Sequence, residues 1–144
     1  MIITRAPLRI SFVGGGTDLS DFYRQHPGRV ISATIDKFIY VLINHIPHTK
    51  KVVVKYRTTE SVDHPRQLKH TRVKAALSDL GFERDIEIGT FADISAKAGL
   101  GSSSAFSIAL LKGLNAFLGK NLNRQEVAEA ACRLEIELLK EPIG

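Results

Sequence analysis

The sequence predicts one α+β domain, because strand patterns fill its first part and two long helical patterns follow each other near its end. Its 144 residues are 44% hydrophobic and 24% charged, with 11 Gly and 5 Pro. This composition is typical of a globular domain, and a chain of this length buries roughly 70% of its unfolded surface. Strands and helices do not alternate regularly along the chain, which argues against a wound parallel sheet.

Five segments carry the apolar or alternating patterns expected of strands. They cover residues 2–13, 30–34, 37–46, 52–56 and 85–91. The first segment runs into three glycines at 14–16, which predict a turn. In the third segment, Phe38, Tyr40 and Leu42 share one face with Asn44, as the two-residue period of a strand requires.

Helical patterns predict a short helix over 18–25 and longer ones over 67–80, over 102–118 and from residue 123 onward. The last helix has Asn123 as N-cap and Glu126 three residues later, which together form a capping box. Its predicted buried face consists of Val127, Ala131, Leu134 and Leu138. We expect Pro142 to end it.

Several classes of protein are excluded by simple counts. Cys132 is the single cysteine, so a disulfide framework and a CxxC metal knuckle are both excluded, and we expect it to be a small buried side chain. No apolar run approaches 18 residues, and Arg5 and Arg9 interrupt the apolar start of the chain. We therefore predict neither a signal peptide nor a membrane span, and a soluble, cytoplasmic protein without a membrane partner.

The distribution of basic residues and the spacing of the histidines do not point to one function. Eight of the 20 basic residues, but two of the 15 acidic ones, lie between residues 48 and 74. Such a segment attracts nucleic acid or a phosphorylated small molecule, or is simply a solvated face. Four histidines lack the spacing of a metal site: His45, His48, His64 and His70. We expect His70 to serve in packing or at the surface.

The segment Lys-Ala-Gly-Leu-Gly-Ser-Ser-Ser-Ala at 97–105 lies between a predicted strand and a strongly apolar helix. Its glycines permit close backbone approach, and the unpaired N–H groups at the start of a helix attract an anion. It lacks the Walker A and GxGxxG patterns. Physical reasoning alone leaves two interpretations open: a phosphate-binding loop, or a glycine turn with a serine N-cap.

Residues 99–105, Gly-Leu-Gly-Ser-Ser-Ser-Ala, resemble the signature of the galactokinase, homoserine kinase, mevalonate kinase and phosphomevalonate kinase (GHMP) superfamily. Residues 6–18, Ala-Pro-Leu-Arg-Ile-Ser-Phe-Val-Gly-Gly-Gly-Thr-Asp, resemble its first motif. With Ala-Thr-Ile-Asp-Lys at 33–37, the wording is most similar to D-glycero-D-manno-heptose 7-phosphate kinases and related fucokinase-like sugar kinases.

The resemblance implies a fold and a domain organisation. The fold would be the ribosomal protein S5 domain 2-like one, a mixed sheet of four or five strands with helices on one face and a left-handed βαβ crossover. Residues 1–144 would form the N-terminal, ATP-binding domain, and the C-terminal domain of the family is missing from this chain. The missing domain would cover one face of the sheet. We expect this face, left exposed, to favour self-association into a homo-oligomer.

The resemblance also implies that the cofactors are ATP and Mg²⁺. The residues that would hold the ATP phosphates are Gly99, Leu100, Gly101, Ser102, Ser103 and Ser104, with Lys97 neutralising a phosphate. Ser103 and Glu135 would be ligands of Mg²⁺. The alternative for Glu135 is a surface carboxylate on an amphipathic helix, in which case Glu137 is the second candidate.

The sugar would be held by the first motif. Arg9 would lie beside the reacting hydroxyl, where a guanidinium stabilises the charge of a transferring phosphoryl group. Asp18 would hydrogen-bond the sugar or else cap the helix that follows, and Thr17 is a turn residue or a hydroxyl contact. Gly15 and Gly16 stand where galactokinases carry a polar pair, which leaves room for a bulkier or phosphorylated sugar or for backbone N–H contacts.

These expectations describe the N-terminal half of a sugar kinase that transfers the γ-phosphoryl group of ATP, with the anomeric hydroxyl of a heptose 7-phosphate as acceptor. The catalytic aspartate of the family would fall just beyond Gly144, so the fragment alone should be inactive. Two other classes remain open: a non-catalytic nucleotide-binding fragment, and an S5-like nucleic-acid-binding module.

Overall fold

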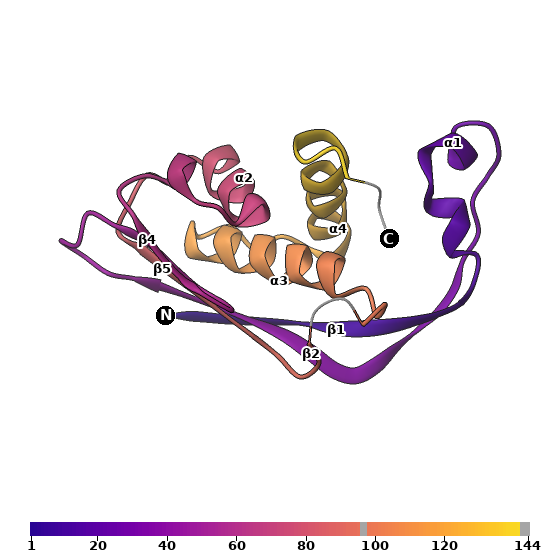
Figure 1. Cartoon of the computed structure of the whole chain (residues 1–144), viewed down its shortest axis with the longest axis horizontal. Coiled ribbons are helices and arrows are strands. Elements are labelled where there is room, and N and C mark those ends of the chain that lie inside the picture. Colours follow the sequence, from indigo (N-terminus) through magenta and orange to yellow (C-terminus); the bar gives the residue numbers. More distant parts are fainter. Residues whose placement is uncertain (96–97, 142–144) are drawn as a thin grey trace.

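The computed structural model describes residues 1–95 and 98–141, which form a mixed sheet covered on one face by helices (Figure 1). The strands are β1 (Ile2–Val13), β2 (Ile31–His45), β3 (Val52–Lys55), β4 (Thr59–Val62) and β5 (Ile86–Ala92). The α-helices are α1 (Ser20–Tyr23), α2 (Thr71–Asp79), α3 (Ser102–Phe117) and α4 (Arg124–Cys132). The 3-10 helices η1 (Gly15–Asp18) and η2 (Pro65–Gln67) and the π-helix η3 (Arg133–Leu138) complete the described elements.

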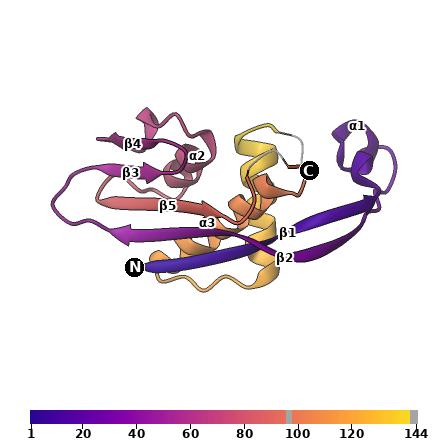
Figure 2. The same ribbon diagram turned by 60° about the horizontal axis from the view of Figure 1, so that its bottom comes forward.

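The five strands lie in the order β1-β2-β5-β3-β4 (Figure 2). All neighbouring pairs are antiparallel except β3 and β5, which are parallel and are joined through β4 and α2. This confirms the predicted α+β class and the mixed sheet. The sequence analysis missed β4, a four-residue edge strand whose mixed polar residues carry little strand signal.

Strand β2 is one continuous strand, so the predicted division into two strands is wrong. Its register against β1 shifts between the pairs Pro7–Phe38 and Arg9–Thr34, where three residues of β2 lie opposite one of β1. The apparent break in the apolar pattern is therefore a bulge. At this bulge the backbone N–H of Arg9 donates instead to the carbonyl oxygen of Leu100, at 3.0 Å.

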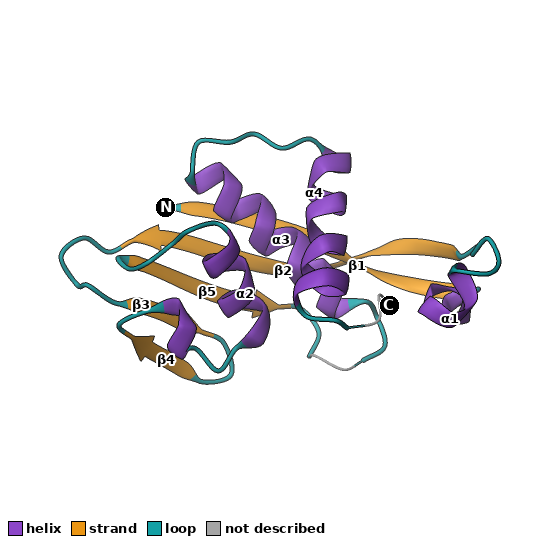
Figure 3. Ribbon diagram, turned by 90° about the horizontal axis from the view of Figure 1, so that it is seen from above, coloured by secondary structure: helices purple, strands orange, loops and turns teal. Residues whose placement is uncertain are grey.

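The core lies between the sheet and α2, α3 and α4 (Figures 1 and 3). Alternate residues of the strands, including Val41, Ile43 and Ile88, are buried against the apolar faces of these helices. Helix α3 approaches the sheet closely at Gly113, where an added Cβ would lie 2.8 Å from Ile43 Cδ1. In the described part of the chain, no helix is long and apolar enough to cross a membrane.

The second long helix begins as predicted but ends differently. Asn123 and Glu126 form the expected capping box. From Arg133 the helix becomes a π-helix, and the N–H of Leu139 donates to the carbonyl oxygen of Leu134, five residues earlier. The wider turn rotates Leu138 out of the apolar stripe to 40% exposure, so its predicted burial is wrong. The expected stop at Pro142 lies outside the described residues.

Cys132 is exposed, so its predicted burial is also wrong. Its neighbour Ala131 faces the core, and the next residue of an α-helix points about 100° away from that face.

Two helices start later than their sequence patterns predict. Helix α2 begins at Thr71, because His70 serves as its N-cap and its Nδ1 accepts from Val73 N. Helix α1 begins at Ser20 with Leu19 as N-cap, so the role of helix cap for Asp18 is not observed. Helix α1 lies at the far end of the β1–β2 hairpin, which extends away from the helical layer (Figure 3).

Candidate functional site

The loop before α3 has the backbone geometry of an anion site. Gly99 and Gly101 adopt left-handed conformations, with φ of 72° and 68°. Gly101 is the N-cap of α3 and supplies no side-chain cap, so the three serines are the first helical residues rather than caps. Gly101 has no side chain to cap the first N–H groups of this 16-residue helix, and the N-terminus of a helix favours an anion.

Arg9 lies directly against this loop, although 90 residues separate it from Gly99. Its backbone bond to Leu100 fixes β1 beside the loop, and its side chain packs on Gly101. A Cβ at Gly101 would lie 3.0 Å from Arg9 Cγ, which is closer than most Cβ contacts, and the φ of 68° also favours glycine there. The guanidinium donates to Ser11 Oγ at 2.6 Å.

Glu135 is a buried carboxylate at the N-terminal end of α3. It is 3% exposed, and its Oε1 lies 2.7 Å from Ser107 Oγ. Its Oε2 lies 3.5 Å from Ser104 Oγ. The expectation of a surface carboxylate is therefore wrong for Glu135, whereas Glu137 is exposed and pairs with Arg133 at 3.7 Å.

Arg72, on α2, is a site residue that the sequence analysis missed. Its Nε lies 3.8 Å from Glu135 Oε1, and its Nη2 donates to Glu141 Oε2. The buried Nε has no hydrogen-bond partner among the described residues. The basic segment contained Arg72, but nothing in the sequence singled it out from its seven basic neighbours.

Ser107 was missed for a different reason. A serine on the apolar face of a helix usually donates its hydroxyl to a carbonyl oxygen of the preceding turn. The Ser107 hydroxyl does lie 3.3 Å from the Ser103 carbonyl oxygen. The signal available in the sequence was the pairing of two polar residues, Ser107 and Glu135, each on the otherwise apolar face of one of two adjacent helices.

A cavity of about 600 Å³, which we call the loop cavity, opens at the start of α3. Ser102, Ser103, Arg57 and Arg72 line it. The remaining lining residues are mostly apolar or aromatic: Ile39, Tyr56, His70, Thr90, Phe91, Ala92, Ile94, Ser95 and Phe106. A cavity with apolar walls and a few convergent cations and hydroxyls suits a ligand that has both a flat apolar part and an anionic part.

His70 forms part of an aromatic wall in the loop cavity. Its ring lies 4.8 Å from that of Tyr56 and 5.3 Å from that of Phe106, centroid to centroid. Burial lowers the pKa of His70 below its ordinary value of 6.5, although the charge of Glu60 opposes this shift. Near pH 7 the wall is therefore neutral. His70 serves in packing, one of the two roles that the sequence analysis expected.

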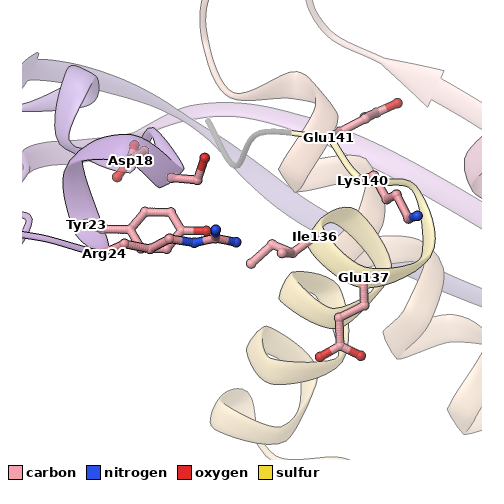
Figure 4. A pocket seen from close by; sticks show the side chains of 8 residues that line it. Asp18, Tyr23, Arg24, Ile136, Glu137, Lys140 and Glu141 are labelled. Carbon is pink, nitrogen blue, oxygen red and sulfur yellow. The ribbon is translucent and has the colours of Figure 1, made fainter.

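A second cavity of about 500 Å³, which we call the hairpin pocket, lies between α1 and η3 (Figure 4). Its lining residues are Asp18, Ser20, Tyr23, Arg24, Ile136, Glu137, Lys140 and Glu141. The ion pair of Arg72 with Glu141 connects the two cavities, because Arg72 lines the loop cavity and Glu141 lines the hairpin pocket. The two cavities are therefore neighbours across one ion pair.

The rest of the first motif builds the turn beside the hairpin pocket. Thr17 Oγ1 lies 2.7 Å from the Gly14 carbonyl oxygen and 3.1 Å from the Arg29 carbonyl oxygen, as expected of a turn residue. Gly14 has a φ of 96° and no room for a Cβ, whereas Gly15 and Gly16 have open space around them. Lys97 lies outside the described residues.

The oxygen donors near the loop fit a small divalent cation. Glu135 offers a buried carboxylate, and the serines at the start of α3 offer hydroxyl oxygens, which are ligands that Mg²⁺ prefers. Among residues 1–95 and 98–141, no three His, Cys, Asp or Glu side chains gather to hold a metal by themselves. Such a sparse set matches Mg²⁺ that takes its remaining ligands from phosphate oxygens and water.

Comparison with known proteins places this chain in a family of small-molecule kinases. The family described as "GHMP kinases N terminal domain" matches residues 69–144, and the chain belongs to it. Among curated relatives, 4-diphosphocytidyl-2-C-methyl-D-erythritol kinase of Ligilactobacillus salivarius is 31% identical over 76% of this chain and 38% of its own length. D-glycero-alpha-D-manno-heptose 7-phosphate kinase of Campylobacter jejuni is 25% identical over 94% of this chain and 43% of its own.

Solved structures confirm the fold. A D-glycero-D-manno-heptose 1-phosphate kinase from Bacteriodes thetaiotaomicron has a TM-score of 0.84 and 25% identity, covering 98% of this chain and 50% of that one. Phosphomevalonate kinase of Streptococcus pneumoniae, solved with phosphomevalonate and AMPPNP, has a TM-score of 0.74 and 12% identity over 94% of this chain and 43% of its own. The chain thus spans half or less of the length of these relatives. The predicted membership of the GHMP superfamily, with similarity to heptose phosphate kinases, is confirmed.

Proposed function

We propose that the whole protein is an ATP-dependent kinase and that the described residues form its nucleotide-binding part. The observation that carries this proposal is the loop cavity, where the N-terminus of α3, two serines and two arginines converge beside apolar walls. The phosphates would bind residues 99–104, and the base and ribose would lie against the aromatic wall. The family membership and the AMPPNP complex of a relative support the choice of nucleotide.

Mg²⁺ would be held by Glu135 and Ser103, and when bound it neutralises charge on the phosphates. Glu135 is suited to this role because its carboxylate is already fixed by Ser107 and faced by Arg72. In the structure Ser104 is the serine within hydrogen-bond reach of Glu135, while Ser103 lines the cavity. The proposal that Ser103 is a Mg²⁺ ligand therefore rests on its position in the wall of the loop cavity.

The acceptor would be a sugar hydroxyl, whose oxygen would attack the γ-phosphorus while the bond from that phosphorus to the β,γ-bridging oxygen breaks. ADP would leave with the electron pair of that bond, and the hydroxyl proton would pass to water. Arg9, packed on the loop, would stabilise the negative charge of the phosphoryl group in transit. Asp18, with Gly15, Gly16 and Thr17 beside it, would orient the sugar from the hairpin pocket. The acceptor we propose is the anomeric hydroxyl of a heptose 7-phosphate, and the relative described as a heptose 7-phosphate kinase supports the choice of this sugar phosphate.

The test is Mg²⁺-dependent nucleotide binding and phosphoryl transfer by the whole protein. We expect Ser103→Ala to weaken binding of Mg²⁺-AMPPNP by about tenfold, since one ligand to the charged group is lost. Ser61→Ala, on the exposed edge strand β4, is the matched control. Equal nucleotide binding by Ser103→Ala and the unsubstituted protein would refute the role of Ser103, and absence of any nucleotide binding would refute the proposed function.

A further inference from the structure

Ser107 lies between the two residues that we propose as Mg²⁺ ligands. It is on α3, one turn after Ser103, and its side chain is fully buried. Its Oγ lies 2.7 Å from Glu135 Oε1 and 3.3 Å from the Ser103 carbonyl oxygen. A hydroxyl has one proton to donate, and an ionised carboxylate at the shorter distance is the stronger acceptor. Ser107 therefore holds one particular oxygen of the Glu135 carboxylate.

The two oxygens of that carboxylate have different surroundings. Oε1 accepts from Ser107 and faces the positively charged Arg72 side chain, whose Nε lies at 3.8 Å. Oε2 faces the first turn of α3, where Ser104 Oγ lies at 3.5 Å, a long distance for a hydrogen bond. A cation that approached Oε1 would meet a donated proton and a guanidinium. The carboxylate thus presents Oε2 to a cation and keeps Oε1 occupied.

The number of oxygens that a carboxylate presents affects which cation it prefers. Ca²⁺ takes about six to eight oxygen ligands in a flexible geometry, and both oxygens of one carboxylate often bind it. Mg²⁺ is smaller, requires a nearly ideal octahedron and keeps several of its waters. A carboxylate that presents one oxygen therefore suits Mg²⁺ and offers Ca²⁺ fewer ligands than Ca²⁺ usually takes.

Burial keeps the Glu135 carboxylate in this orientation. The residue is 3% exposed, and its carbonyl oxygen accepts from the backbone N–H of Glu141 at 2.8 Å. Side chains in a close-packed interior have little room to rotate. Turning the second oxygen of Glu135 toward a larger ion would also break the hydrogen bond from Ser107.

We propose that Ser107 is a positioning residue that makes the site select Mg²⁺ over Ca²⁺, because it holds Oε1 of Glu135 and leaves Oε2 for the cation. This inference rests on the proposed kinase function, with Glu135 as a ligand of the cation. Ser107 itself touches neither the cation nor the nucleotide, and it acts through the carboxylate. A residue that served only in packing would affect stability without affecting the choice between two cations.

The test compares binding of Mg²⁺-AMPPNP and Ca²⁺-AMPPNP to the whole protein by calorimetry, with each cation in large excess over the nucleotide. We expect the unsubstituted protein to bind the Mg²⁺ complex more tightly, by about tenfold or more. In Ser107→Ala this ratio should fall to about threefold or less, because the released carboxylate can present both oxygens. Ser107→Cys keeps a weak donor and should give an intermediate ratio.

Asn115→Ala is the matched control. Asn115 is another buried polar residue of α3, and its Nδ2 donates to the carbonyl oxygen of Leu111 within the same helix. Its replacement should lower the stability, measured by thermal unfolding, and leave the ratio between the two cations unchanged.

The proposal is overturned if Ser107→Ala keeps the Mg²⁺ preference of the unsubstituted protein. It is equally overturned if the unsubstituted protein binds the Mg²⁺ and Ca²⁺ complexes with the same affinity, a result that does not depend on the folding of any variant. Absence of AMPPNP binding with either cation would instead refute the proposed function, and this inference with it.

Discussion

Glu135 is a buried carboxylate whose nearest cation, the Arg72 guanidinium, lies at 3.8 Å without a hydrogen bond between them. The hydroxyls of Ser107 and Ser104 lie 2.7 Å and 3.5 Å from the carboxylate, but a buried charge paired this loosely with its cation costs stability unless another positive group completes its surroundings. The incomplete pairing is what a ligand for a divalent cation requires, because a tighter ion pair with Arg72 would compete with the metal. Its environment therefore argues for function rather than for stability.

Replacing Glu135 with Gln separates these two roles. We expect Glu135→Gln to weaken Mg²⁺-dependent binding of AMPPNP by about 10- to 100-fold, because the anionic ligand is lost. Thermal stability should stay equal or rise, because a buried charge is removed. Calorimetric titration with and without Mg²⁺, together with thermal unfolding, measures both. Glu137→Gln, on the exposed side of η3, is the control and should change neither quantity.

His70 gives the stability of the protein a defined dependence on pH. Its pKa is lowered in the folded state, chiefly by burial, so the unfolded chain binds its proton more readily. The free energy of unfolding must then fall as the pH drops below about 6.5, the ordinary value, and rise again as the pH returns to neutral. Protonation of Nδ1 would also remove the acceptor that caps α2.

The variant His70→Asn should reduce this dependence, since Asn keeps a cap acceptor and does not titrate. Urea unfolding at several values between about pH 5 and pH 7.5 measures the slope. Glu60 does not confuse this measurement. Burial raises the pKa of Glu60, but hydrogen bonds from Lys69 N and Tyr56 Oη lower it below 4.5, so the stability that Glu60 contributes is lost only in more acidic solution. A slope unchanged in His70→Asn would show that His70 is not its source.

Sequence reasoning located the motif residues and missed the residues that connect them. Gly101, Arg9 and Glu135 were singled out, and the structure brings Arg9 and Gly101 into contact and Glu135 to the first turns of α3. Arg72 and Ser107 were missed because their roles depend on contacts between helices, and such contacts leave no local pattern. Asp18 lies in a separate pocket, which no spacing along the chain could reveal.

At the scale of elements, apolar periodicity predicted the long strands and α3 well but not the irregular segments. The β1–β2 bulge was mistaken for a break, and η3 was predicted as regular helix. Extra residues in a strand pairing or a helical turn change the phase of an apolar pattern without changing its composition. Both irregularities carry site residues: the bulge releases the Arg9 N–H to the loop, and the π-helix contains Glu135.

The close approach of α3 to the sheet predicts the effect of Gly113→Ala. In an exposed helix this change stabilises by about 0.5–1 kcal/mol. Here the new methyl group would lie 2.8 Å from Ile43 Cδ1 and 3.1 Å from Thr4 Oγ1, so we expect a loss of about 1–3 kcal/mol instead. Chemical denaturation gives the sign directly. A more stable variant would mean that α3 packs less closely on β1 and β2 than the structure indicates.

Across the whole molecule, the basic residues of 48–74 do not form one continuous cationic surface. Lys51 pairs with Asp63 and Lys55 with Glu87. Arg57 and Arg72 line the loop cavity. Half of the eight basic side chains are thus committed to ion pairs or to the proposed nucleotide site.

We therefore expect no binding to single-stranded RNA at about 0.15 M salt and up to about 10 μM protein. Fluorescence anisotropy of a labelled homopolymer, titrated with and without Mg²⁺-ATP, measures this. Tight binding that weakens steeply with salt and ignores the nucleotide would support the nucleic-acid-binding alternative instead.

The face of the sheet opposite the helices also belongs to this scale. Tyr40 and Leu42 lie on it with Phe38, as their alternation predicts, and Ile3 and Phe91 are 58% and 63% exposed there. Further exposed apolar side chains lie along the hairpin that carries α1, among them Phe12 and Ile31. Self-association through these surfaces stays a prediction.

The position of β5 in the middle of the sheet also determines when the site can form during folding. β1 with β2, and β3 with β4, are hairpins of sequence neighbours that can pair early, but neither hairpin contacts the other in the sheet until β5 inserts between β2 and β3. Pairings between distant residues form slowly because a long loop must close first. On a ribosome, then, the two hairpins emerge as unconnected pieces. The segment that joins them is also the one that leads into the glycine loop, so we expect the sheet to close and the start of α3 to take its place in a single late event.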